Sequence, residues 1–313
     1  MSAIGMQRPN PSIPLWAFLM GLGLLLDAVA LTLLFAFRSG EPVGASPSNR
    51  ATLLVMLALG TGVLTVGLGI PMILTVSRAG RSGGTSLGSH RVILGTTLLV
   101  VLVSNTLPTI YGVMTSVAQL RTLQGFSLAA LSVELTLIGA AYLRLIRSGQ
   151  TSWRGLGFDR QRIGIDIIYG LGYGVLTFVV SALLQSLLEL IGIHQTQLHE
   201  LSWIRDLDIP GFLLLFALGA IGAPVAEELY FRGYVFTAYL RDKGPIAAYL
   251  LSGLVFAGLH LNKEALLPIF ILGMMLAWIY RRSNSIIPSI TAHALNNGVA
   301  FLIFYFGSSL GQQ

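Results

Sequence analysis

Cysteine is absent from the 313 residues of this chain, and charged residues are scarce at 10%. The first absence excludes disulfides, thiolate metal ligands, thiol nucleophiles and any S-acyl or prenyl anchor on the chain itself. Soluble domains carry about 25% charged residues, so the second excludes an ordinary soluble enzyme. Hydrophobic residues make up 54% of the chain. They come in runs near the roughly 20 apolar residues that a bilayer-spanning helix needs. The composition therefore predicts an all-α, polytopic transmembrane helical bundle.

Nine apolar runs are separated by short polar loops. The first exceeds the roughly 7–15 apolar residues of a signal-peptide core, so we expect an uncleaved anchor there. The seventh and eighth runs are short. The candidate spans cover residues 15–37, 52–77, 92–118, 126–146, 163–193, 211–240, 245–260, 264–280 and 286–306. The expected bundle thus has about nine spans.

Basic residues are distributed unevenly between the loops on the two sides of these spans. Most of the 19 Lys and Arg residues fall on the side that carries the N-terminus, including the loop 145–162. Because Lys and Arg are retained in cytoplasmic loops, we expect a multi-pass integral membrane protein with a cytoplasmic N-terminus. We expect it in a plasma membrane or a thylakoid-like inner membrane. The net charge of +6 is such a topology signal and predicts no nucleic-acid partner.

The basic loop 145–162 is also the predicted boundary between two parts of the chain. Residues 1–150 form N-terminal transmembrane helices of unknown role, and residues 163–306 contain most of the buried charge. The lone acid Glu134 in the first part has no sequence-adjacent partner, which favours a packed, hydrogen-bonding role over a catalytic one. Glycines at positions 170, 172 and 174 predict close helix packing.

Two adjacent acids and an arginine interrupt the sixth apolar run. Positions four apart share one helix face, so Glu228 and Arg232 are expected to pair, whereas Glu227 points elsewhere. A buried charge is costly and needs a partner or a function. The pattern predicts one carboxylate held charged and one left free for acid-base chemistry; the structural alternative is an ion pair beside a neutral Glu227. Pro224 lacks a backbone N–H and is expected to kink the span or open it to water.

Two later runs contribute histidines. Phe256 and His260 lie four apart on one helix face, as do His293 and Asn297. In one possible chemistry, Glu227 and His260 activate a water that attacks an amide. His293 and Asn297 then stabilise the oxyanion. In the other chemistry, His260, His293 and Glu227 hold a zinc ion. The sequence has no HExxH spacing, and Asn is a poor zinc ligand, so chemistry without a cofactor is favoured.

Together these motifs resemble those of the CPBP family, also called the Abi or CAAX protease family. The resemblance rests on Glu-Glu-x-x-x-Arg, Phe-x-x-x-His and His-x-x-x-Asn, which occur in the family's order in consecutive apolar spans, and it covers residues 163–306. It implies an all-helical intramembrane endopeptidase of the glutamic type. The residues carried over are Glu227 and His260 for water activation, His293 and Asn297 for the oxyanion hole, and Glu228 and Arg232 for orienting the site.

The expected partners are membrane lipids and a peptide or lipid-modified protein substrate, with a prenylated CAAX-like protein among the candidates. Two other functions compete with the peptidase. One is a catalytically silent scaffold or chaperone that binds a partner through its N-terminal helices. The other is a transporter or channel that uses the buried charges as a relay. The absence of a repeated half with a second broken helix argues against an inverted-repeat transporter.

Overall fold

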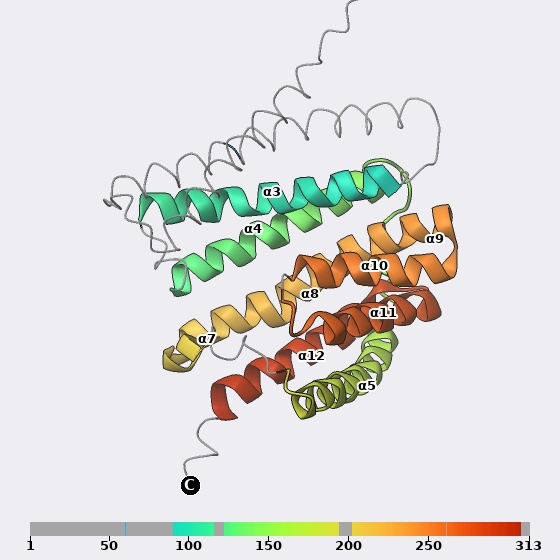
Figure 1. Ribbon diagram of the computed structural model, residues 1–313. Coiled ribbons are helices and arrows are strands. Elements are labelled where there is room, and N and C mark those ends of the chain that lie inside the picture. The colour runs from blue at the N-terminus through green and yellow to red at the C-terminus, as the bar shows by residue number, and fades with distance from the viewer. Residues whose placement is uncertain (1–59, 61–89, 116–121, 194–201, 261, 308–313) are drawn as a thin grey trace, which may run out of the picture. The chain divides into compact units, whose positions relative to one another are not determined.

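A computed structural model describes residues 60, 90–115, 122–193, 202–260 and 262–307 (Figure 1). The chain divides into two compact units, residues 1–75 and 76–313, and every element described below lies in the second. All elements of the described residues are helical, which confirms the predicted all-α class. Their bounds are α3 His90–Met114, α4 Leu123–Ala141, η2 Tyr142–Ile146, α5 Ile163–Leu190, η3 Ser202–Asp206, α7 Ile209–Phe216, η4 Ala217–Gly222, α8 Ala223–Glu228, η5 Leu229–Phe236, α9 Thr237–Lys243, α10 Pro245–Leu259, α11 Leu266–Ser283 and α12 Ile286–Phe306.

Six helical stretches among the described residues are long and apolar enough to cross a bilayer, as expected for an integral membrane protein. They are Val92–Gly112, Leu123–Ile146, Ile163–Leu190, Ile209–Lys243, Leu266–Ser283 and Ile286–Phe306. The predicted run 245–260 forms the shorter helix α10. The predicted spans 15–37 and 52–77 fall almost wholly outside the described residues, so the count of nine is not confirmed.

Local capping fixes where several of these helices begin. The Asp208 carboxylate accepts a hydrogen bond from the Gly211 N–H and starts α7, and the Ser285 hydroxyl accepts one from the Ile287 N–H and starts α12. Side-chain caps of this kind satisfy N–H groups that have no partner inside the helix. These two starts set the register of α7 and α12, whose later turns carry residues of the site.

The stretch Ile209–Lys243 is one long helix at the centre of the bundle. Its segment η5 is entirely buried. Figure 1 shows α3 and α4 on one side of this helix and α5, α11 and α12 on the other. The Tyr230 hydroxyl lies 2.9 Å from the Thr97 hydroxyl, and the Tyr239 hydroxyl lies 2.9 Å from His90 Nδ1. Helices from both sides of residue 150 thus share one core, and the division of roles at that residue stays a prediction.

Close contact between α5 and α12 depends on two glycines. A Cβ atom at Gly170 would lie 2.5 Å from the Thr291 Cβ, and one at Gly174 would lie 3.0 Å from the Leu295 Cβ. A Cβ at Gly172 would meet nothing within 4 Å. The predicted packing role is therefore confirmed for Gly170 and Gly174 and is wrong for Gly172, which lies on another face of α5.

Candidate active site

Two π-helical segments, η4 and η5, flank the short α8 that carries the paired acids. Pro224 lies at the start of α8, and the helix passes through it without a break. The π register explains how. The Ala223 N–H bonds to the Leu218 carbonyl five residues earlier, so the next bond in the series would join residue 224 to the Gly219 carbonyl. Proline has no N–H to make it.

Asn297 replaces that missing bond from another helix. Its Nδ2 donates to the Gly219 carbonyl at 3.1 Å. A Cβ at Gly219 would lie 2.5 Å from the Phe301 ring, so the absence of a side chain there lets α12 approach η4. The structure thus has a widened turn at Pro224 whose free carbonyl anchors Asn297, while the predicted kink or opening to water stays a prediction. Such π segments are common at functional sites.

Glu228 is shared between two basic side chains. Its Oε1 lies 2.8 Å from Arg232 Nη1 and accepts a 3.0 Å hydrogen bond from His293 Nδ1. Glu228 and Arg232 are 0% and 1% exposed, and His293 is 2% exposed. The predicted pair therefore exists. It also orients His293, because the bond at Nδ1 leaves Nε2 to face the other glutamate.

Arg232 is held on two further sides. Its Nη2 donates to the Gly273 carbonyl at 3.1 Å, and its guanidinium lies 4.4 Å from the centroid of the Phe256 ring. A fully buried guanidinium needs such contacts, because its donors have no water. Phe256 thus links the ion pair on the long helix to α10.

His260 stands at the end of α10 with a defined orientation. Its Nδ1 lies 2.8 Å from the Phe256 carbonyl oxygen, which can only accept, so Nδ1 carries the proton and donates. The ring packs against Phe256 with centroids 4.8 Å apart. In the neutral ring, Nε2 is then the acceptor nitrogen.

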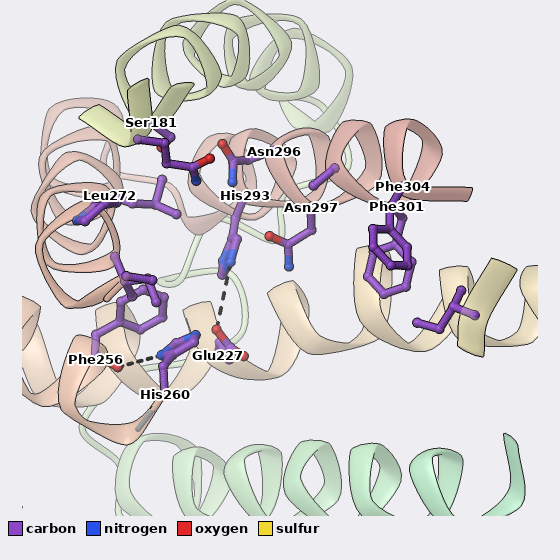
Figure 2. Close-up of a pocket in the computed structure, with 16 residues that line it drawn as sticks. Ser181, Glu227, Phe256, His260, Leu272, His293, Asn296, Asn297, Phe301 and Phe304 are labelled. Carbon is purple, nitrogen blue, oxygen red and sulfur yellow. Dashed lines mark hydrogen bonds and ion pairs between the residues drawn. The ribbon is translucent and has the colours of Figure 1, made fainter. Parts of the chain in front are cut away.

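A cavity of about 380 Å³ collects four of the six predicted site residues: Glu227, His260, His293 and Asn297. Figure 2 shows Glu227 between the two histidines, with Asn297 on the neighbouring turn of α12. The Glu227 side chain is 17% exposed, and its Oε2 lies 3.9 Å from His293 Nε2. That oxygen has no hydrogen-bond partner among the described residues. Glu228 and Arg232 do not line the cavity; they lie behind it.

The cavity has a second polar side that the motifs did not reveal. Ser181 and Gln185 of α5 and Asn296 of α12 line it, together with apolar residues that include Phe301 and Phe304. A signal was present in the sequence, since Ser181 and Gln185 lie four apart in an apolar span. A helix face alone, however, does not say whether polar side chains meet a neighbouring helix or a cavity.

Glu134 approaches the site from α4. It is 7% exposed, and a Cβ at Gly222 would lie 2.5 Å from its Oε2. Its carboxyl group therefore packs against the turn that precedes Glu227. Among the described residues, Oε1 of Glu134 has no hydrogen-bond partner. The packed position agrees with the prediction, whereas the hydrogen bond expected of this side chain is not found among the described residues.

The alternative chemistry requires His260, His293 and Glu227 to hold one zinc ion. Among the described residues, no three His, Asp or Glu side chains are grouped so as to hold one metal ion. Both histidines use Nδ1 in hydrogen bonds within the protein and leave Nε2 free, as zinc-bound histidines also do, whereas Asn297 is committed to a carbonyl. The arrangement does not match the three protein ligands of a catalytic zinc site, so no chemical step is derived through a metal.

Comparison with known proteins supports the motif reading. The model of the family "Type II CAAX prenyl endopeptidase Rce1-like" matches residues 209–299, which contain all six predicted site residues. A segment of 83 residues is 36% identical to UPF0177 protein YxdF of Lactococcus lactis subsp. lactis. That match covers 26% of this chain and 45% of the relative, so the chain spans less than half of the relative's length. No solved structure matches the chain significantly. The predicted resemblance is confirmed: residues 209–299 match the Rce1-like family model, which is consistent with the CPBP family.

Proposed function

We propose that this chain is an intramembrane endopeptidase of the glutamic type. The observation that carries the proposal is the carboxyl group of Glu227, which lines the cavity next to a histidine oriented by a buried ion pair, and whose Oε2 has no hydrogen-bond partner among the described residues. A carboxylate with a free oxygen in a mostly apolar cavity is placed to take a proton from water. The Rce1-like match supports peptide hydrolysis as the reaction.

In the first step, water lies between Glu227 and His260. The acceptor nitrogen Nε2 of His260 receives one hydrogen bond, and the Glu227 carboxylate removes the other proton. The hydroxide oxygen bonds to the carbonyl carbon of the substrate, and the carbonyl electron pair moves onto its oxygen. The Phe256 carbonyl fixes the ring of His260, so little reorientation is needed when the water binds.

Stabilising the oxyanion requires hydrogen-bond donors within reach of the substrate carbonyl. His293 provides Nε2–H when its ring carries both protons, and Glu228 balances the resulting charge, since it lies between Arg232 and His293. The second N–H of Asn297 is the other donor, because the first is occupied by the Gly219 carbonyl.

Collapse of the tetrahedral intermediate completes the reaction. The carbonyl re-forms, the C–N bond breaks, and the proton held by Glu227 passes to the leaving amine nitrogen. The acid product passes its remaining proton to the amine product, which gives a new carboxylate and a new ammonium group. We propose that the substrate is a membrane-associated protein, with a prenylated CAAX-like protein as the first candidate on the strength of the family match.

A cleavage assay on the purified full-length chain in detergent tests this function. The substrates are quenched fluorescent peptides, prenylated and unprenylated, and the chain is compared with Glu227→Gln, with and without a chelator. Loss of the general base predicts a kcat about 10²–10⁴-fold lower in the variant. Glu189→Gln is the matched control, because Glu189 is exposed on α5 and does not line the cavity.

The outcomes separate the alternatives. Cleavage that survives the chelator and is lost only in Glu227→Gln supports the glutamic peptidase. Cleavage abolished by the chelator and restored by zinc contradicts it. If neither chain cleaves any peptide while both bind the same membrane partner, the scaffold function replaces the enzyme.

A further inference from the structure

The cavity wall opposite the predicted catalytic acids carries polar side chains that are not needed to hold neighbouring helices together. Ser181, Gln185 and Asn296 line it. The described residues make no hydrogen bond to the side chains of Ser181 and Gln185, and Oδ1 of Asn296 is buried without a partner. Unpaired polar side chains inside a membrane protein are costly and mark a site of contact with water or ligand.

The packing of α5 on α12 explains why these groups face the cavity. Gly170 and Gly174 bring the two helices into close contact along one face of α5. Ser181 lies seven residues after Gly174, and Gln185 lies four residues after Ser181, so both continue the same face of α5. There they line the cavity. Leu183 and Leu187, on the outer face, are 59% and 58% exposed and meet lipid.

The chemistry of the wall selects its ligand. Gln and Asn amides each present a donor and an acceptor, which is the pattern of a peptide unit, and Ser can serve as either. The three side chains are uncharged, and the described residues that line the cavity include no Lys or Arg. The apolar lining, with Phe301 and Phe304 among its members, suits uncharged side chains.

The spacing matches an extended chain. Four residues of α-helix rise about 6 Å, so Ser181 and Gln185 are separated by about that distance along α5. Two residues of an extended strand advance about 6.6 Å. Every second residue of an extended peptide that lies along α5 would therefore present its backbone groups to one of these two side chains. Figure 2 shows Ser181 and Asn296 on the side of the cavity away from His260, which leaves the space between for the scissile bond.

We propose that Ser181, Gln185 and Asn296 form a main-chain clamp that binds an internal, uncharged stretch of substrate in an extended conformation. This inference rests on the proposed peptidase function and adds the class of substrate. The clamp positions the substrate and takes no part in proton transfer.

The test combines protein variants with changes to the substrate backbone. In a cleaved peptide, each amide away from the scissile bond is replaced in turn by an ester, which removes one N–H donor. With the unmodified chain, two replacements spaced two residues apart should raise KM about 3–10-fold each, the equivalent of one hydrogen bond, with little change in kcat. In Gln185→Leu one of these penalties should disappear, and in Ser181→Ala the other. Ser186→Ala, exposed on α5 and absent from the cavity lining, is the control and should keep both.

Identical ester penalties in all four proteins would overturn the clamp. If the unmodified chain cleaves no peptide, the peptidase function fails by itself, and the same series is then read as Kd for the uncleaved peptides. The same pattern of penalties in Kd supports the clamp as a peptide site. A uniform Kd across the series, or no binding at all, rejects it.

Discussion

The long helix Ile209–Lys243 and the helix α5 are both membrane spans with polar side chains, but they treat those groups in opposite ways. On the long helix, Glu228 and Arg232 are fully buried and contact protein on every side. On α5, Ser181 and Gln185 are partly exposed in a cavity and bond to none of the described residues.

The difference separates two uses of polarity in an apolar medium. A buried charge that is held by an ion pair and a hydrogen bond has a defined position, so it orients its neighbours, as Glu228 orients His293. A polar group without a partner retains its bonding capacity for a ligand. On the long helix, Glu227 differs from Glu228 and Arg232 because it lines the cavity, and it is the residue assigned the proton transfer.

Breaking the ion pair should give the largest effect on stability. Arg232→Leu leaves Glu228 buried beside His293 alone, and loss of one partner of a buried pair costs about 3–5 kcal/mol. We expect a matching loss in the free energy of unfolding, measured by denaturant titration in detergent.

A double variant sharpens that test. Glu228→Leu with Arg232→Leu removes both charges and should recover part of the loss, because no unpaired charge remains. Its activity should stay low, since His293 loses its acceptor. If the single variant is as stable as the unmodified chain, the pair does not fix the site and the contrast with α5 collapses.

Substituting two glycines of α5 should change the stability by an intermediate amount, and one of the two variants serves as the control for the other. An alanine Cβ at Gly170 would lie 2.5 Å from the Thr291 Cβ and 2.9 Å from the Pro288 carbonyl oxygen. Gly170→Ala should therefore destabilise the protein by about 1–3 kcal/mol. Gly172→Ala meets nothing within 4 Å and should stabilise it by about 0.5–1 kcal/mol. Thermal unfolding of the two variants should shift in opposite directions, and equal shifts would mean that α5 does not pack on α12 as described.

The fold was predictable from the sequence as far as it depends on one-dimensional patterns. Apolar runs locate the described membrane helices to within a few residues, as the predicted 286–306 and α12 show. The run 211–240 lies within Ile209–Lys243, but its π turns were not foreseen. They depend on how Pro224 and Gly219 are accommodated by a neighbouring helix, which no local pattern contains.

The site was predictable where its residues follow helical spacing. Glu228 and Arg232 pair as the i, i+4 rule requires, and the two histidines converge on Glu227. The positions of Asn296 and Gln185 at the cavity were not predicted, because they depend on how α5 and α12 pack against each other. The packed role of Glu134 was predicted, but its neighbour was not, because the packing of α4 on η4 is what places Glu134 beside Gly222.

The smallest expected effect concerns the packing of α4 on η4. It tests whether Glu134 is packed against protein, as Glu228 is, or is without a partner, as Gln185 is. A Cβ at Gly222 would meet the end of the Glu134 side chain at 2.5 Å. Because a side-chain end moves more easily than backbone, Gly222→Ala should cost about 1 kcal/mol, the low end for overpacking. In a Glu134→Ala background the same substitution should cost nothing, so a double-mutant cycle on the free energy of unfolding should give a coupling near 1 kcal/mol. Full additivity would show that the carboxyl group of Glu134 does not pack on this turn and that α4 contributes nothing to the surroundings of Glu227.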